Sequence, residues 1–235
     1  MSWWQKLQGK KSRLAVEREA RLRVIDQNKV SFLIKPNQNV EIQNISSGGI
    51  AIPRTTLFNA EVGQIISGEL NFLKRQSFNL QAKVAHLSSS TIGMSFNEQT
   101  AELAIALNQF FRAEMVGARL RLVDKKYLKV PQNGEPLWLT DGQENELYVV
   151  FDQSGILSFH MTFLGHYVEG GPDKKLVVGQ VAKGSEDRKQ NMQAESELIT
   201  FNDSARASTL QLAREYVMNA AGIPAARLEQ LLKLL

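Results

Sequence analysis

Apolar and polar residues alternate in several short stretches along the first half of the chain. An alternation with a period of two is typical of half-buried β-strands. Turn-forming residues separate the stretches, as in the segment Lys35-Pro36-Asn37-Gln38. Short, regularly spaced strands favour an antiparallel barrel or sandwich. The pattern predicts six strands, at residues 30–34, 40–45, 50–52, 64–72, 78–86 and 91–96.

Helical patterns lie on either side of this set of strands. Residues 2–22 are rich in Ala, Glu, Leu and Arg, which predicts a helix at the start of the chain. Residues 103–115 carry a broad apolar face, which predicts a helix that caps the barrel.

The second half of the chain reads as further strands that end in two helices. A polar stretch over 183–195 predicts a loop, and Gly170-Gly171-Pro172-Asp173 predicts a turn. Asp203 or Ser204 is a good N-cap for a helix over 205–221. Gly222 ends that helix, and Pro224 begins another that runs to Leu235. The strands are predicted at residues 119–123, 127–130, 137–139, 146–151, 156–163, 176–182 and 197–201.

The length of 235 residues fits one large or two ordinary domains. The fold class is therefore mainly β, of α+β type. The expected organisation is a basic amphipathic arm over 1–16, a β-barrel domain over 17–114 and a β-rich second domain over 117–235.

One turn in the first half carries candidate binding chemistry. It reads Asn44-Ile45-Ser46-Ser47-Gly48-Gly49 and stands between two strand patterns. Glycines accept backbone angles that other residues avoid, and short Asn and Ser side chains can bond to a ligand's polar edge. Three arginines, Arg18, Arg21 and Arg23, lie about twenty residues upstream. Their planar donor forks suit phosphates and the acceptor edge of guanine.

The turn and the arginines together resemble a PilZ domain, whose motif is (Asp/Asn)-x-Ser-x-x-Gly. Asn44, Ser46 and Gly49 fill that pattern. The strand sequences at 68–72, 81–85 and 92–96 and the apolar helix 103–111 are similar to later elements of the family. The resemblance covers roughly residues 17–112. It implies a six-stranded antiparallel barrel with a closing helix, and binding of cyclic di-GMP, a bacterial second messenger.

The arginine segment departs from the family's Arg-x-x-x-Arg spacing. If Arg23 takes the place of the last arginine, Glu19 occupies the earlier one and Arg18 matches an extra leading arginine. A carboxylate repels a dianionic ligand, while Arg18 or Arg21 can compensate because this segment is expected to be a flexible linker. Two interpretations therefore stay open: a nucleotide-binding domain, or a degenerate domain that keeps the fold without the ligand.

Positive charge is concentrated at the start of the chain. Residues 1–35 hold nine Lys or Arg and three acids, so their net charge is 9 − 3 = +6, against +4 for the whole chain. Such an arm can bind a nucleotide or an anionic surface, or can simply be solvated. Trp3 and Trp4 beside lysines allow peripheral membrane contact, but packing on the protein is the preferred expectation. Nucleic-acid binding is not expected, because no basic cluster alternates with aromatic residues elsewhere.

The sequence offers little for catalysis or metal binding. Zero cysteines exclude disulfides, thiolate catalysis and cysteine-based metal sites. We expect His86 to be structural. His160 and His166 are placed on one strand with the same facing, where Glu169 or Asp173 would be the nearest further ligands, and coincidence is the preferred interpretation. We therefore expect that the protein is not an enzyme and that it has no catalytic residue, metal or cofactor.

The leading hypothesis is a cyclic di-GMP receptor with the second half as output module. Its ligand-binding residues would be Arg18, Arg21, Arg23, Asn44, Ser46 and Gly49, with the arginine arm folding over the ligand. The alternative is a degenerate PilZ scaffold that binds protein partners of motility or cell-surface machinery without nucleotide. An enzyme in the second half is a third, weaker hypothesis. With no long apolar run and no secretory signal, the expected location is the cytoplasm.

Overall fold

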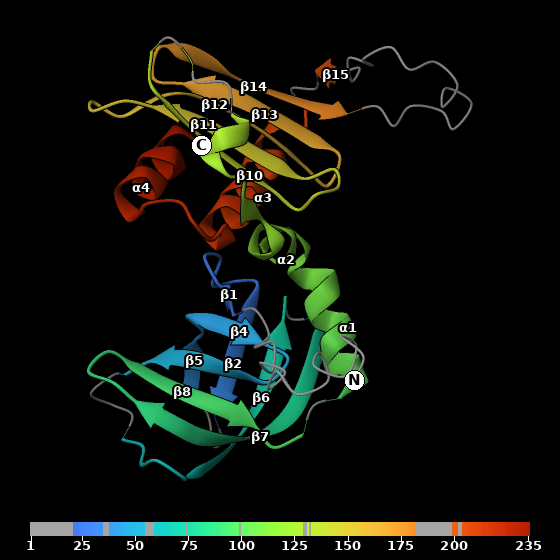
Figure 1. Cartoon of the computed structure of the whole chain (residues 1–235). Helices are drawn as coiled ribbons and strands as arrows, with labels where there is room; N and C mark the ends of the chain where they lie inside the picture. Colours follow the sequence, from blue (N-terminus) through green and yellow to red (C-terminus); the bar gives the residue numbers. More distant parts are fainter. Residues whose placement is uncertain are drawn as a thin grey trace, which may run out of the picture.

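The computed structural model describes residues 21–34, 38–54, 59–73, 75–98, 100–128, 131, 133–181, 199–201 and 204–235. The chain forms two bodies, each built on an antiparallel sheet, with helices between them (Figure 1). The fold is therefore mainly β, as the alternating pattern predicts.

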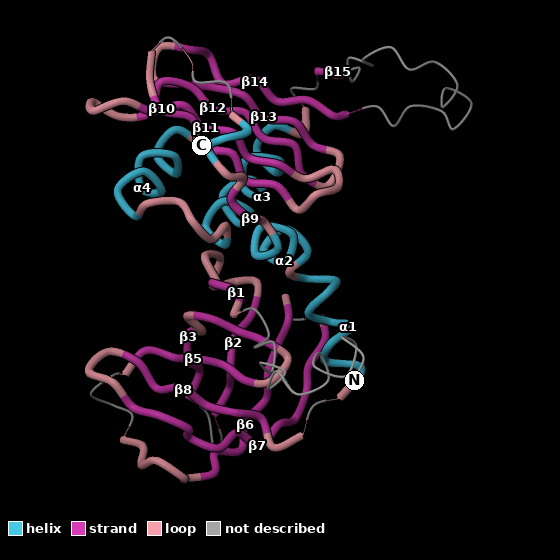
Figure 2. Tube along the Cα trace, viewed as in Figure 1, coloured by secondary structure: helices cyan, strands magenta, loops and turns pink. Residues whose placement is uncertain are grey.

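The first sheet has eight strands within the described residues, in the order β1-β4-β5-β8-β7-β6-β2-β3. It curls on itself, as the tube in Figure 2 shows. Its strands are β1 (Leu22–Arg23), β2 (Val30–Ile34), β3 (Gln38–Glu41), β4 (Asn44–Ser46), β5 (Gly49–Pro53), β6 (Ile65–Phe72), β7 (Gln76–Leu87) and β8 (Thr91–Phe96).

The prediction of six strands was wrong in two places. The run predicted as one strand over 40–45 divides into β3 and β4, because β3 pairs with β2 whereas β4 pairs with β1 and β5. The change of partner falls at Ile42, both of whose backbone groups bond to the side-chain amide of Gln27. Leu22 was predicted to lie in a helix but belongs to β1.

The interior of the first body is filled from alternate strand positions. In β2, Val30, Phe32 and Ile34 point inward. The stacked rings of Phe72 and Phe110 lie 5.3 Å apart, and Phe111 meets Phe72 edge-on. Burial of this apolar surface is the main stabilising contribution to the first body.

Two short helices lead from the first body to the second. Helix α1 (Ala101–Phe110) begins at Thr100, whose side chain accepts a hydrogen bond from the backbone of Leu103. Helix α2 (Arg112–Arg119) follows after a break at Phe111. The prediction of one helix over 103–115 was therefore wrong. The chain bends at Phe111, which is fully buried in the first core, whereas Ala113 packs in the second.

The second sheet has seven strands within the described residues, in the order β15-β14-β13-β12-β11-β10-β9. Each of its strands pairs with its neighbour in the chain, so the sheet is an antiparallel meander. The strands are β9 (Arg121–Leu122), β10 (Glu135–Thr140), β11 (Glu146–Phe151), β12 (Ile156–Phe163), β13 (His166–Gly171), β14 (Lys174–Val181) and β15 (Ile199–Phe201).

Several predictions for this sheet need correction. The predicted strand over 127–130 is not formed at Tyr127, which ends a 3-10 helix, η2 (Lys125–Tyr127). Strand β13 was not predicted, and Gly170 and Gly171, predicted as part of a turn, lie within it. The strands β11 and β12 agree with their predicted ranges. The predicted loop over 183–195 lies outside the described residues.

Helices α3 (Arg206–Asn219) and α4 (Ala225–Leu234) cover one face of this sheet (Figure 1). Tyr216 of α3 is fully buried and stacks on Phe163 of β12 with ring centroids 4.8 Å apart. The residue at the N-cap of α3 is Ala205 and not the predicted Ser204, and Asp203 lies outside the described residues. Leu231 of α4 is also fully buried, so this helix packs on the core of the second body.

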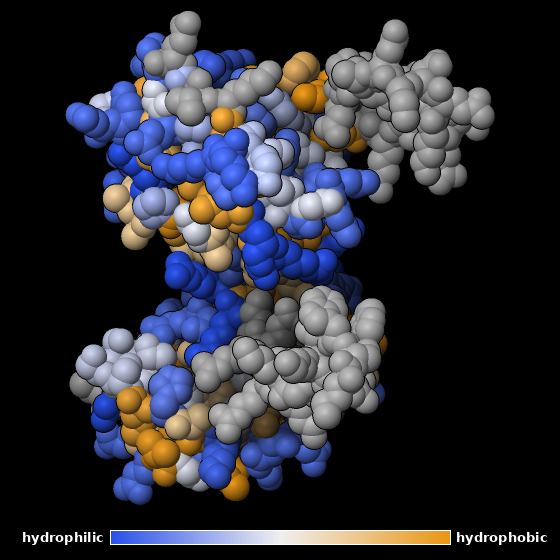
Figure 3. Space-filling model, in the orientation of Figure 1, coloured by the Kyte–Doolittle hydropathy of each residue, from blue (hydrophilic) through white to orange (hydrophobic). Residues whose placement is uncertain are grey.

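Helices α2 and α3 lie between the two sheets, where the molecule narrows (Figures 1 and 3). The space-filling view shows hydrophilic residues around this narrow part. None of the helices in the described parts of the chain combines the length and the apolar character needed to cross a bilayer.

Candidate functional site

The arginine segment lies directly beside the turn motif. Strand β1 pairs antiparallel with β4, which sets Leu22 opposite Ile45 and Arg23 opposite Asn44. Leu22 and Ile45 are buried, so Arg23 and Asn44 face outward. If this register is continued by one residue, Arg21 falls opposite Ser46. Cross-strand neighbours on one face are close enough for their side chains to act together.

Hydrogen bonds hold the two segments in this register. The backbone N–H of Val24 donates to the carbonyl of Gln43 at 3.0 Å, so the pairing extends past the end of β1. The Gln27 side chain donates to the carbonyl of Ile42 and accepts from its N–H. Of the arginine segment predicted to be a flexible linker, Leu22 and Arg23 are therefore fixed to the sheet, whereas residues 18–20 lie outside the described residues.

The turn itself is held by contacts with β8. Ser46 pairs with Gly49 across the turn, and the carbonyl of Gly48 accepts a hydrogen bond from the Phe96 backbone at 2.9 Å. A Cβ at Gly49 would overlap the carbonyl oxygen of Met94. The predicted reason for glycine here was an unusual backbone angle, but Gly49 does not have a positive φ. Close approach of the neighbouring strand is the reason.

We call the outward-facing residues Arg21, Arg23, Asn44, Ser46 and Gly49 the arginine–turn surface. The structure brings these five candidate site residues together. Four lie on strands β1, β4 and β5, and Arg21 immediately precedes β1. Arg21 and Arg23 are exposed, whereas Asn44 and Ser46 are half-buried. Arg18, and with it Glu19, Trp3 and Trp4, lies outside the described residues.

A side chain from the second body binds the free edge of β1. The Arg23 N–H donates to Oδ1 of Asn219 at 2.7 Å, and Nδ2 of Asn219 donates to the Arg23 carbonyl at 3.2 Å. Asn219 is the last residue of α3 and also donates to the carbonyl of Glu215. The amide thus takes the place of a neighbouring strand, and it ties the arginine–turn surface to α3.

A buried ionic cluster lies at the same junction. Nζ of Lys29 donates to Oε1 of Glu114 on α2 at 2.7 Å and to Oε2 of Glu215 on α3 at 2.8 Å. All three residues are buried, and Nζ also lies 5.0 Å from the ring centre of Phe111. We call Lys29, Glu114 and Glu215 the Lys29 cluster. It joins one residue of the first body to both helices of the junction.

The charges of the Lys29 cluster do not balance. Two carboxylates face one ammonium, and Oε2 of Glu114 has no hydrogen-bond partner within the described structure. Burial raises the pKa of the Glu114 carboxyl, and the opposing influence of Lys29 does not cancel this effect. A proton held on Glu114 would make the cluster neutral.

The sequence pattern did not reveal Lys29, Glu114, Glu215 or Asn219. Their partners are 85, 186 and 196 positions away in the chain, so no local spacing connects them. A lysine before a strand or a glutamate in a helix is ordinarily a solvated residue. No feature of the sequence alone could have separated these residues from that common case.

The histidines do not form the arrangement predicted from the sequence. His160 lies on β12 and His166 on β13, so they do not share a strand. His160 is partly exposed and stacks on Tyr148, whereas His166 lies near Phe163, and burial lowers its pKa. The prediction that His160 and His166 face the same side of one strand was wrong, because a turn at Leu164 and Gly165 separates these two histidines. Within the described residues, no group of three or more His, Asp or Glu side chains could hold a metal ion.

Comparison with known proteins identifies a family for the N-terminal part of the chain. No curated protein matches the chain. A crystal structure of an uncharacterized Legionella protein matches 38% of this chain and 90% of its own at 19% identity, with a TM-score of 0.32. The family model described as PilZ domain matches residues 10–113, which identifies the N-terminal half of this chain as a PilZ domain.

Proposed function

We propose that the protein is a receptor for cyclic di-GMP and that the arginine–turn surface binds the nucleotide. PilZ domains form a binding family that takes this ligand, and the matched residues contain the whole surface. Arg21 and Arg23 would contact the phosphates and guanine edges. Asn44 and Ser46 would offer polar atoms to the ligand, and Gly49 would let it approach the backbone. Arg18 is the remaining arginine assigned to the ligand.

The cross-strand pair of Arg23 and Asn44 is the observation that carries this proposal. It places a guanidinium and the first residue of the turn motif on one outward face, although they are 21 positions apart in the chain. Arginine binds phosphate with two parallel, charge-assisted hydrogen bonds, which are about twice as strong as neutral ones. Because the backbone is already fixed by β4 and Asn219, ligand binding has less chain to order.

The second body is the proposed output module. A ligand that draws the side chain of Arg23 onto the turn also acts on its backbone, which is bonded to Asn219 of α3. The same helix contributes Glu215 to the Lys29 cluster. Ligand binding would thus change the free energy of the contact between β1 and α3, and through it the state of the junction.

A scaffold that binds protein partners without nucleotide is the second candidate. One observation favours it: Nη1 of Arg23 lies 3.9 Å from the sulfur of Met218, so this guanidinium already contacts α3. Glu19 in the place of a family arginine acts in the same direction.

Titration calorimetry with cyclic di-GMP separates the two candidates. The receptor proposal expects saturable binding by the full chain and its loss in Arg23→Ala and Ser46→Ala. Arg75→Ala is the matched control, because Arg75 is an exposed arginine in the turn between β6 and β7. If the unaltered chain shows no binding by calorimetry or by a second method, the scaffold candidate is favoured.

A further inference from the structure

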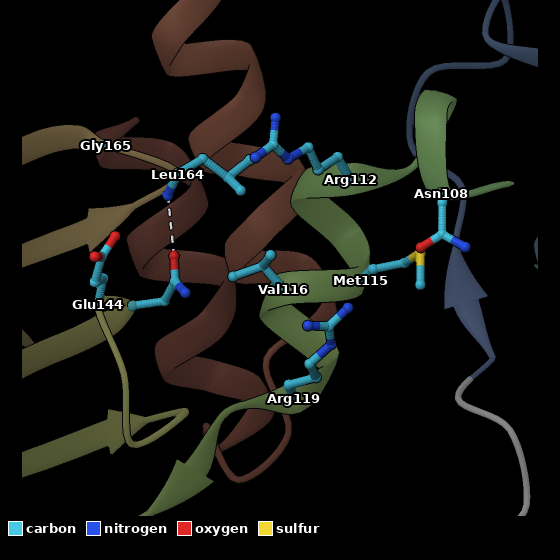
Figure 4. Close-up of a pocket in the computed structure, with 9 residues that line it drawn as sticks. Asn108, Arg112, Met115, Val116, Arg119, Glu144, Leu164 and Gly165 are labelled. Carbon is cyan, nitrogen blue, oxygen red and sulfur yellow. Dashed lines mark hydrogen bonds between the residues drawn. The ribbon is translucent and has the colours of Figure 1, made fainter. Parts of the chain in front are cut away.

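A cavity of about 450 Å³ lies between helices α1 and α2 and two turns of the second sheet. Its walls come from α1 and α2 on one side and from the turns β10–β11 and β12–β13 on the other (Figure 4). It shares no residue with the arginine–turn surface. Its volume falls within the range of small-molecule sites, about 300–1,000 Å³. We call this cavity the junction pocket.

Two arginines of α2 line the junction pocket. Arg112 and Arg119 are seven residues apart, which is about two helical turns or ~10.5 Å along the axis, so they project on the same side of the helix. Figure 4 shows them on either side of Val116, with the side chain of Arg112 extending toward Leu164 on the opposite wall. Both are exposed, and neither guanidinium has a hydrogen-bond or ion-pair partner within the described part of the chain.

The opposite wall of the junction pocket is held rigidly. Oδ1 of Asn145 accepts a hydrogen bond from the Leu164 backbone at 3.0 Å (Figure 4), and its Nδ2 donates to Asp141 at 2.6 Å. Leu164 and Gly165 have φ of 52° and 78°, which is the conformation that a tight two-residue turn between paired strands requires. The wall is therefore fixed before any ligand arrives.

The polar groups of the junction pocket define the chemistry of its occupant. Two unpaired guanidinium groups on α2 favour a phosphate, which arginine binds with its planar fork of donors. Glu144 on the facing wall has a carboxylate that accepts hydrogen bonds. A matching ligand carries anionic oxygens at one end and N–H donors at the other. The backbone and side-chain amides of Asn145 are already bonded to Asp141 and Leu164. The two arginines and Glu144 are therefore the groups that select the ligand.

We propose that the junction pocket is a second ligand site, which binds a phosphorylated small molecule of the size of a purine mononucleotide. The phosphate lies between Arg112 and Arg119, and the N–H edge of the base faces Glu144. This site is independent of the arginine–turn surface, because the two share no side chain. A ligand here would contact the first and second bodies at once, since Asn108 of α1 also lines the pocket.

The test is titration calorimetry of the full chain with GMP at low ionic strength, where charge interactions are least screened. We expect saturable binding that weakens by at least about tenfold in the Arg112→Met/Arg119→Met variant, because two charged contacts are lost. Arg75→Met, the matched control, should bind as the unaltered chain does. Glu144→Gln should weaken GMP binding without changing the binding of inorganic phosphate.

The variant Arg23→Ala keeps this site separate from the proposed receptor function, because it alters only the arginine–turn surface. GMP binding that survives Arg23→Ala and is lost in Arg112→Met/Arg119→Met supports the junction pocket. Binding that is equal in the unaltered chain and in the double variant overturns it, as does the absence of saturable GMP binding. An unchanged melting temperature establishes that the double variant is folded.

Discussion

The single positive charge of Lys29 holds the first body to helices α2 and α3. Its ammonium bonds to two buried carboxylates, and removal of it would leave both without a cation. We expect Lys29→Met to lower the free energy of unfolding by about 3–5 kcal/mol, measured by urea denaturation. Lys125→Met is the control. Its ion pair with Glu135 is exposed, so the expected loss is about 0–1 kcal/mol. Equal losses in the two variants would contradict a structural role of the cluster.

Glu114 gives the same cluster a dependence on pH. Its pKa is raised from the ordinary 4.5, so the folded state holds a proton that the unfolded state releases. The stabilisation is complete below 4.5 and is lost as pH rises through the folded pKa. As pH rises through the folded pKa of Glu114, we expect the unfolding free energy of the unaltered chain to fall relative to that of the Glu114→Gln variant. A difference between the two proteins that stays constant from pH 4 to pH 8 would contradict a raised pKa.

At the residue scale, the sequence is informative where a local pattern defines the site. Asn44, Ser46 and Gly49 lie within six consecutive positions, so their common surface was predictable. Even there, the reason for Gly49 was not, because it depends on the carbonyl of Met94 from a strand 45 residues away in the chain. Asn219 could not be predicted, since it acts through the backbone of Arg23.

At the scale of elements, α2 and α3 approach each other closely at Gly117. A Cβ at Gly117 would overlap the carbonyl oxygen of Tyr216, so these helices pack backbone against backbone. We expect Gly117→Ala to force them apart and to reduce the unfolding free energy by about 1–3 kcal/mol, measured by urea denaturation. Arg112→Ala, an exposed change on the same helix, should stay within about 0.5 kcal/mol. An increase in stability in Gly117→Ala, as helix propensity alone predicts, would contradict this packing.

The strands whose alternation is clear were predictable, whereas β13, which ends in two consecutive glycines, was not. Strands β11 and β12 have apolar residues at alternate positions on the helix-covered face and agree with prediction. Strand β13 ends in Gly170 and Gly171, which the pattern assigned to a turn. In the fold, a Cβ at Gly171 would crowd the carbonyl of Leu157. The break at Phe111 was hidden because the apolar pattern runs on through α1 and α2, although they serve different cores.

At the scale of the whole molecule, the bond between Arg23 and Asn219 connects the proposed ligand surface to the second body. We expect cyclic di-GMP to change the hydrogen–deuterium exchange of α3 in the unaltered chain and to leave it unchanged in Asn219→Ala. The reason is that the variant keeps the arginine–turn surface and removes its tie to α3. Asn97→Ala, an exposed asparagine at the end of β8, is the matched control. A ligand effect on α3 that persists in Asn219→Ala would show that another route connects the two bodies.

Amide NMR spectroscopy during a nucleotide titration locates directly where cyclic di-GMP binds, and the proposed place is the arginine–turn surface. We expect saturable shifts of the backbone amides of Arg23 and of residues 44–49, with smaller shifts at Asn219. The same titration of Arg23→Ala should leave these amides unmoved. Shifts confined to other residues, or no shifts at all in the unaltered chain, would contradict the claim.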